Sequence, residues 1–405
     1  MSWTRRSFLG VFGAASYAGE NRTPSVRAIT HGPKYHWFGY YDKLQFDPTS
    51  RYALGNEVSF EHRSPAPDDV IRVGYIDTED GDRWTEIGVS RAWNWQQGCM
   101  LQWIPGSRDE VIWNDREGDR FISRIKNIRT GKERILPAPI YCLSPDGVSA
   151  LYPDFRRLND CRPGYGYAGI PDPNRDKLAP EDAGIWHLDL KTGKTKLLIS
   201  FAQAMRIPHP GGYSNHAKHW FNHLLYSPNG KRFIFLHRWR GDQEGKSFST
   251  RMFTANHNGA DLYVLDPYGR TSHFIWRDPQ HVLAWAWHPS HKERFYLYRD
   301  RTDRVEVVGP DVMTVNGHCS YLPGKRYILN DTYPDKQRNQ HVYLYEVATG
   351  RRIPLGSFHS PKEYTGEWRC DTHPRYSPDG KKVVIDSPHG GHGRQMYLLD
   401  LNGIL

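Results

Sequence analysis

Apolar and polar residues alternate in short runs along this chain, and a turn sequence of the SPDG type recurs between the runs. Each copy has an aromatic or apolar residue before the turn and a strand-like run after it, as in YSPDGKKVVI. Alternation with period two indicates a half-buried strand, and Pro, Asp and Gly favour a tight turn between two strands. Seven copies occur, and they begin at Phe46, Trp103, Leu143, Tyr226, Trp287, Tyr321 and Tyr376.

Most copies are followed by a second hairpin signal, an apolar run that ends in a Gly and a basic residue, such as VYLYEVATGRRIPL. Two hairpins per repeat make a four-stranded unit, which is typical of a propeller blade. We therefore predict an all-β fold, a seven-bladed β-propeller with four-stranded antiparallel blades around a central channel, as one domain over residues 19–405. Six or eight blades are the alternative counts, because the fifth repeat lacks a clear second turn.

Composition and charge narrow the choice of partner. Aromatic residues make up 13% of the chain, with 37 Gly and 28 Pro, which suits many short strands better than long helices. The formal net charge of +9 favours an anionic partner. The basic residues are scattered, and no zinc-finger or RNA-binding signature occurs, so an anionic polysaccharide or oligosaccharide is preferred over nucleic acid. We expect a monomer with no nucleic-acid or membrane partner.

The amino terminus carries a separate signal. The sequence TRRSFL at residues 4–9 looks like a twin-arginine export signal, and the apolar run that follows it is too short to span a bilayer. We expect residues 1–18 to be an export signal and the protein to be periplasmic or secreted. Twin-arginine systems export folded proteins that often carry a cofactor, which favours a bound metal.

Alignment of the seven turns brings histidines into register. In three copies a His stands three residues before the aromatic residue, on the strand expected to line the channel. Side chains at equivalent positions of different blades converge around one axis, so three such imidazoles predict a metal site that Cys370 or Asp371 could complete. A thiolate ligand would favour zinc, whereas a carboxylate ligand would also allow manganese. Alternatively, each His only hydrogen-bonds to a neighbouring blade. We expect this metal to be divalent, with zinc preferred over manganese. Its predicted ligands are His223, His318, Cys370 and His373.

Two segments resemble a known family at these residues. CDTHPRYSPDG, residues 370–380, resembles the metal motif of the oligogalacturonate lyases, in which a Gln, two residues, a His, one residue and a second His precede such a turn. Cys370 falls at the Gln position and His373 at the first His, whereas Arg375 replaces the second His. GHCSYLPGKRYILNDTYPD resembles the ligand segment of the preceding blade, with His318 as the matching ligand. The wider pattern, including STRMFTA and RPGYGY, is similar to exported propellers grouped near the ulvan lyases.

The resemblance implies a polysaccharide lyase that cleaves a uronic-acid-containing anionic polysaccharide by β-elimination. Such an enzyme neutralises the sugar carboxylate, removes the C5 proton with a base and protonates the leaving oxygen. Arg251 is the predicted neutralising residue because a guanidinium matches a carboxylate. His219 is the predicted base, with His216 as its alternative, and Tyr41 is the predicted acid. The predicted substrate-binding residues are His36, Arg162, Tyr165 and Arg375.

Two other functions compete with this prediction. A non-catalytic periplasmic propeller that binds a glycan or a protein would need no metal. A glycoside hydrolase on the same scaffold would need two carboxylates that face each other. Four aspartates could contribute to that pair, but unlike the histidines they do not lie at equivalent positions of the repeats. They are Asp42, Asp115, Asp331 and Asp386.

Overall fold

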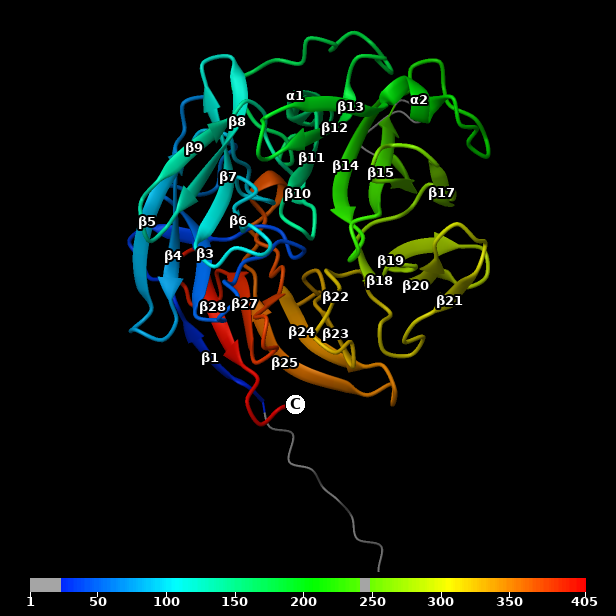
Figure 1. Cartoon of the computed structure of the whole chain (residues 1–405). Helices are drawn as coiled ribbons and strands as arrows, with labels where there is room; N and C mark the ends of the chain where they lie inside the picture. Colours follow the sequence, from blue (N-terminus) through cyan, green and yellow to red (C-terminus); the bar gives the residue numbers. More distant parts are fainter. Residues whose placement is uncertain (1–22, 241–247) are drawn as a thin grey trace, which may run out of the picture.

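Seven four-stranded antiparallel sheets make up the fold. The computed structural model describes residues 23–240 and 248–405. Figure 1 shows the sheets arranged as blades around a central axis, so the predicted seven-bladed propeller is confirmed. The predicted export signal at residues 1–18 lies outside the described residues. None of the helices in the described ranges has the length and apolar character needed to cross a membrane.

In blades 1 to 6 the strands run outward from the axis in chain order (Figure 1). Blade 1 contains β2 (Tyr35–Trp37), β3 (Tyr52–Val58), β4 (Ile71–Asp77) and β5 (Arg83–Ser90). Blade 2 contains β6 (Gln102–Trp103), β7 (Glu110–Glu117), β8 (Arg120–Asn127) and β9 (Glu133–Leu136). Blade 3 contains β10 (Cys142–Leu143), β11 (Ser149–Pro153), β12 (Gly184–Asp189) and β13 (Thr195–Ser200).

The remaining blades follow the same plan. Blade 4 contains β14 (Lys218–Tyr226), β15 (Arg232–Arg240), β16 (Ser249–Asn256) and β17 (Tyr263–Asp266). Blade 5 contains β18 (Phe274–Asp278), β19 (His281–His288), β20 (Lys292–Arg299) and β21 (Val305–Val307). Blade 6 contains β22 (Ser320–Tyr321), β23 (Tyr327–Asn330), β24 (Asn339–Glu346) and β25 (Arg352–His359). Blade 7 contains β26 (Arg375–Tyr376), β27 (Lys382–Ser387), β28 (Gln395–Asp400) and, from the amino terminus, β1 (Ser25–Ala28).

The fifth blade departs from the sequence alignment. Trp287 lies in β19, the second strand, so the turn that follows it is not the turn between the first two strands. The first hairpin instead turns at Pro279 and Gln280, where Asp278 pairs with His281. This turn has no aromatic-SPDG signature, and the alignment therefore assigned the wrong strand of blade 5 to the channel.

Within the described ranges, three short helices lie between strands, namely α1 (Phe155–Cys161), α2 (Phe201–Met205) and the 3₁₀ helix η1 (Gly366–Trp368). The Asp154 carboxylate accepts hydrogen bonds from two backbone N–H groups of the first turn of α1, which starts the helix there. Arg157 of α1 is buried and donates from Nε to the His219 carbonyl at 3.0 Å and from Nη1 to Asp172 at 3.2 Å. These bonds fix the long insertion between β11 and β12 against blade 4.

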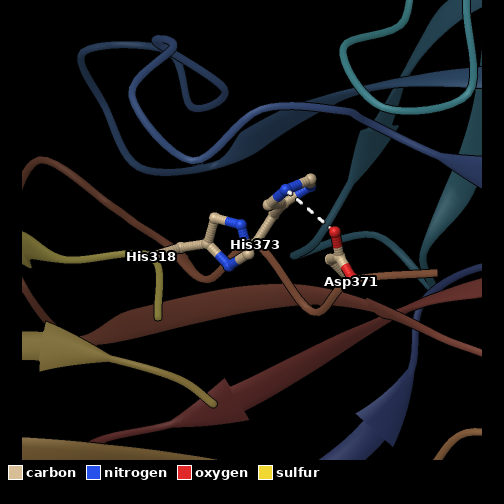
Figure 2. A group of neighbouring side chains, drawn as sticks. All are labelled: His318, Asp371 and His373. Carbon is tan, nitrogen blue, oxygen red and sulfur yellow. Dashed lines mark ion pairs between the residues drawn. The ribbon is translucent and has the colours of Figure 1, made fainter. Parts of the chain in front are cut away.

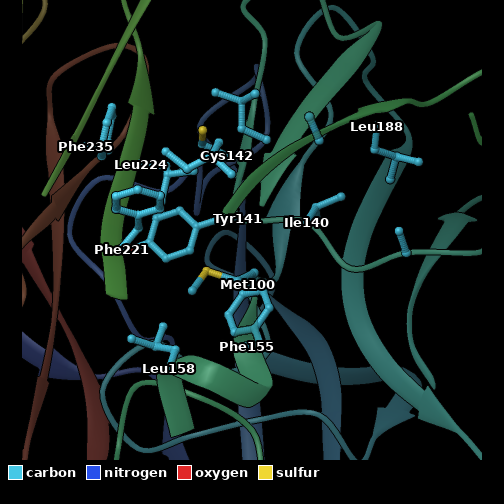
Figure 3. Packing of buried hydrophobic residues seen from close by; sticks show 14 of the residues in the cluster. Met100, Ile140, Tyr141, Cys142, Phe155, Leu158, Leu188, Phe221, Leu224 and Phe235 are labelled. Atoms are coloured by element: carbon cyan, nitrogen blue, oxygen red, sulfur yellow. The ribbon is translucent and has the colours of Figure 1, made fainter. Parts of the chain in front are cut away.

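The core lies between neighbouring blades, where apolar faces of adjacent sheets meet. Figure 3 shows part of the largest cluster, in which Tyr141, Phe155 and Phe221 come from three different elements and pack together. Strand β15 is buried on both faces over most of its length, because blades cover it on each side. Burial of such apolar surface is the main driving force for stacking the blades.

Ring closure joins the two ends of the described chain. β1 pairs with β28, with Val26 opposite Leu399, so an amino-terminal strand completes the carboxyl-terminal blade (Figure 1). The Leu399 side chain is fully buried, whereas Val26 is 39% exposed.

We expect Leu399→Ala to lower the free energy of unfolding by about 2–4 kcal/mol, because it leaves a cavity in blade 7. Val26→Ala, directly across the strand pair, is the matched control and should change it by less than about 0.5 kcal/mol. Urea unfolding followed by tryptophan fluorescence measures both. Equal losses for the two variants would contradict the burial described.

Candidate functional site

Four histidines come from the innermost strands of blades 4 to 7 or from the residues just before them. His273 precedes β18, His318 precedes β22 and His373 precedes β26, whereas His223 lies within β14. The ring centroids of His273 and His318 are 4.1 Å apart, and those of His318 and His373 are 4.2 Å apart. Tyr40 of blade 1 stacks on His223 at 4.8 Å and lies edge-on to His373 at 5.1 Å. The four imidazoles and this phenol form one aromatic cluster.

Asp371 joins two of these histidines in a compact group, which we call the trio: His318, Asp371 and His373. One ligand atom from each lies within 4.8 Å of the others, and all three side chains are buried. Figure 2 shows them pointing toward one another, His318 from the segment before β22 and the other two from the segment before β26. The Nε2 atoms of His318 and His373 have no hydrogen-bond partner among the described residues. Two imidazole nitrogens and a carboxylate are ligands that a divalent metal such as zinc or manganese accepts.

Neighbouring groups orient the trio. Asp331 accepts hydrogen bonds from His318 Nδ1 at 2.9 Å and from the His318 backbone N–H at 2.6 Å. A proton held on Nδ1 leaves the lone pair on Nε2, as in metal sites where a carboxylate supports a ligating His. Arg369 donates from Nε to Asp371 at 2.7 Å and from Nη2 to the Tyr165 hydroxyl at 2.6 Å. The residues around the trio therefore fit a bound metal.

His223 and His373 have unusual backbone conformations. Their φ angles are 52° and 40°, in the left-handed region that non-glycine residues rarely occupy. Arg375 is buried next to His373 and donates to the His373 carbonyl, while its Nη2 donates to Asp386 at 2.8 Å. Arg375 thus holds the loop that presents His373, and these bonds place it beneath the site rather than in the channel.

Burial shapes the protonation of the channel. It lowers the pKa of His373 and His273 well below the usual range for histidine, and the adjacent imidazole of His318 adds to the effect for both. Burial would raise the pKa of Tyr165, but the guanidinium groups of Arg369 and Arg162 outweigh it and lower that pKa. His273 and His373 are therefore neutral at pH 7, with lone pairs available for a metal or a proton.

The other two predicted ligands lie differently. Both ring nitrogens of His223 have protein partners, with Nε2 at 3.2 Å from the Tyr40 hydroxyl and Nδ1 at 3.1 Å from the Tyr141 hydroxyl. Cys370 is buried, and burial raises the pKa of its thiol. Its sulfur is not part of the trio, in which the adjacent Asp371 takes the third position.

The predicted catalytic residues also lie outside the trio. The Tyr41 hydroxyl donates to the Phe274 carbonyl at 2.7 Å and accepts from the Phe274 N–H at 3.0 Å, which ties blade 1 to blade 5. His219 Nδ1 lies 2.9 Å from Nε2 of His237, and both rings are buried. Arg251 is buried beside this pair, where its guanidinium donates to backbone carbonyls around the end of α2.

Two of the predicted substrate-binding residues reach the channel. The Tyr165 ring lies edge-on to His223 at 5.7 Å, and the Arg162 guanidinium lies 4.3 Å from the Tyr165 ring centroid. His36 instead bridges two strands at the junction of blades 1 and 7, with Nδ1 3.0 Å from Gln395 and Nε2 3.2 Å from Glu57.

Sequence alignment missed three residues that contribute to the site or its surroundings. His273 escaped because the fifth turn was assigned to the wrong strand, and a search for His before every innermost strand would have found it. Tyr333, whose hydroxyl lies 3.5 Å from His273 Nε2, follows β23 rather than an innermost strand. Arg238 lies on β15, and nothing in its local sequence distinguishes it from neighbouring arginines.

We expect Arg251→Ala to lower the free energy of unfolding by about 3 kcal/mol, because buried carbonyl groups lose their charged donor. Arg352→Ala, an exposed guanidinium on β25, is the control and should have little effect. Chemical denaturation measures both variants. Unchanged stability of Arg251→Ala would argue against a structural role. The three carbonyls concerned are those of Ala204, Ile207 and Pro208.

Comparison with known proteins supports the fold. No protein-family model and no curated protein matches the chain. Among solved structures, an oligogalacturonate lyase from Vibrio parahaemolyticus is 12% identical with a TM-score of 0.65, covering 93% of this chain and 94% of its own. An oligogalacturonate lyase in complex with manganese is 14% identical with a TM-score of 0.66, covering 93% of each chain. A chain of the mitotic checkpoint complex is 10% identical with a TM-score of 0.52, covering 98% of this chain and 99% of its own. The predicted structural resemblance is confirmed: this chain has the propeller fold of the oligogalacturonate lyase structures.

Proposed function

We propose that this protein is a metal-dependent lyase that cleaves an oligosaccharide at a uronic acid residue by β-elimination. The observation that carries the proposal is the trio, with two buried imidazole nitrogens that have no hydrogen-bond partner among the described residues. The fold shared with oligogalacturonate lyases, one of them in complex with manganese, supports this choice among propeller functions. The twin-arginine sequence near the amino terminus supports action outside the cytoplasm.

The reaction sets three requirements. The C5–H bond breaks and its proton passes to a base, the electron pair forms the C4–C5 double bond, and the C4–O bond breaks. The departing oxygen then takes a proton from an acid. Positive charge near the carboxylate makes the C5 proton more acidic, because it stabilises the carbanion-like transition state.

The trio answers the requirement for positive charge near the carboxylate. A divalent metal held by His318, Asp371 and His373 would supply the positive charge that neutralises the uronate carboxylate. Asp331 keeps His318 in the tautomer with a free Nε2, and Arg369 fixes Asp371 through Nε. Three protein ligands leave open positions for a substrate group, as catalytic metal sites require.

We assign the base to His273 in place of His219. His273 lies next to His318 and has Nδ1 at 3.0 Å from the Asn316 side-chain oxygen, so Nδ1 donates and Nε2 carries the lone pair. His219 lies instead against His237 of the neighbouring strand β15, with its Nδ1 2.9 Å from His237 Nε2. A base adjacent to the metal ligands can reach the carbon next to a metal-bound carboxylate.

We assign the acid to Tyr333 in place of Tyr41. Its hydroxyl lies 3.5 Å from His273 Nε2, and burial raises its pKa, so it remains protonated at neutral pH. Tyr41 is occupied by the Phe274 backbone in both hydrogen-bonding directions.

We expect purified protein to contain about one divalent metal ion per chain. His318→Ala, Asp371→Ala and His373→Ala should each reduce the metal content at least tenfold, measured by inductively coupled plasma mass spectrometry after dialysis. His359→Ala, an exposed histidine on β25, is the control and should keep the metal. Metal content independent of all three trio residues would contradict the site. The same measurement identifies zinc or manganese.

We expect absorbance near 235 nm to rise when the protein acts on a uronate-containing substrate, since elimination creates an unsaturated uronate. The screen covers pectic, ulvan and glycosaminoglycan oligosaccharides. His273→Ala should lower kcat at least 100-fold while retaining the metal, because it removes the base and no ligand. Bound metal without any absorbance change would favour a binding propeller over a lyase. Activity of His273→Ala close to wild type would reject the assigned base.

A further inference from the structure

Two arginines close to the channel residue Tyr165 have no counter-ion among the described residues. Arg238 of β15 is 3% exposed, and Arg162 follows α1 in the insertion of blade 3. Their guanidinium carbons lie 4.9 Å and 4.4 Å from the centroid of the same Phe248 ring. Two cations from different blades are therefore held close together by one aromatic side chain.

Three of the donor nitrogens of these arginines make no hydrogen bond within the described residues. Nε and Nη1 of Arg238 and Nη1 of Arg162 are buried and have no hydrogen-bond partner among the described residues. Burial, and then the charge of Arg162, lowers the pKa of Arg238 to about 9. Two other buried arginines have carboxylate partners, Asp386 for Arg375 and Asp172 for Arg157. A buried cation without a partner destabilises a folded protein. An anion that binds next to it compensates this charge and therefore binds favourably.

The surroundings separate this pair from the trio. Tyr165 lies beside Arg162, and His223 lies edge-on to Tyr165 and stacks on Tyr40. Tyr40 then contacts His373 of the trio. A ligand in the channel can thus touch both the trio and the arginines only if it extends past the Tyr40 and His223 rings.

We propose that Arg162 and Arg238 form an oxyanion subsite that binds the acid group of the sugar next to the uronate held at the trio. A guanidinium presents a planar set of donors that matches a carboxylate or a sulfate ester. The phenol rings of Tyr40 and Tyr165 offer flat faces for the sugar between the two charged groups. The substrate class is accordingly an oligosaccharide with an acid group on two neighbouring sugars. This identification of the ligand rests on the proposed function, whereas the existence of the anion subsite does not.

Sulfate is the first probe, used on the full chain as purified. Isothermal titration calorimetry should give one sulfate per chain for wild type and at least tenfold weaker binding for Arg238→Gln and Arg162→Gln. Arg352→Gln is the matched control, because its guanidinium also lies over a tyrosine ring, that of Tyr343 at 4.2 Å, but is exposed. The control should bind sulfate as wild type does. Equal sulfate affinity in wild type and Arg238→Gln would overturn the subsite.

The melting temperature of each variant distinguishes a lost anion subsite from a misfolded protein. Without sulfate, Arg238→Gln should melt at or above the wild-type temperature, because it removes an uncompensated buried charge. Sulfate should raise the melting temperature of wild type and leave that of Arg238→Gln unchanged. A melting temperature that falls in Arg238→Gln, together with an unchanged response to sulfate, would assign Arg238 a structural role instead.

The second probe is a disaccharide of two uronic acids, compared with the same compound after reduction of one carboxyl group to the alcohol. Calorimetry on the His273→Ala variant should show at least tenfold tighter binding of the di-acid, and the added change Arg238→Gln should remove this preference. A version with a sulfate ester in place of the second carboxylate shows which oxyanion fits better. Equal binding of the di-acid and the reduced compound would overturn the substrate class. Failure of the proposed lyase function would give a different result. The absorbance at 235 nm would not change, while sulfate binding would still depend on Arg238.

Discussion

Backbone pairing of β1 with β28 connects the two ends of the described chain and closes the ring of blades. Ser25–Ala28 lie in register with Tyr397–Asp400, and β2 begins only a few residues later, so blade 1 is fixed against blade 7 by the same closure. The His36 backbone N–H also donates to the Arg394 carbonyl at 2.9 Å. A closed ring leaves each innermost strand at a set position around the axis. The distances among side chains from blades 4 to 7, and therefore the trio, depend on this constraint.

Buried carboxylates in the channel serve mainly to position cationic and imidazole groups. Asp331 holds His318, Asp386 holds Arg375, and Arg369 pairs with Asp371. Each of these carboxylates is committed to a partner, which disfavours a pair of free carboxylates of the kind that a glycoside hydrolase uses. Arg162 and Arg238, in contrast, have no carboxylate partner among the described residues. This distribution suits an anionic ligand better than a neutral one.

Several features of the channel reduce stability locally. His223 and His373 adopt left-handed backbone conformations, and the pairing of β14 with β15 shifts register after Asn222. Arg238 is buried without a counter-ion among the described residues. Such features are maintained by well-packed blades around them, and they typically occur where a protein binds or converts a ligand.

The repeat of turn and strand signals was sufficient to predict the number and type of blades, because period-two alternation and turn chemistry are local properties of the sequence. Alignment of the same turns also predicted that His318 and His373 lie close together, since equivalent positions in neighbouring blades meet around one axis. It failed for His273, because the first turn of blade 5 has a different sequence.

Only the tertiary structure decided which polar residues face the channel and which are committed to structural bonds. Asp371 rather than its neighbour Cys370 points toward His318, and the Arg251 donors bind carbonyls contributed by α2 and the loop after it. The sequence by itself determined the blades and the proximity of His318 and His373. The partners of each buried arginine, tyrosine and carboxylate come from other blades, far away along the chain, and the packing of the closed ring selects them.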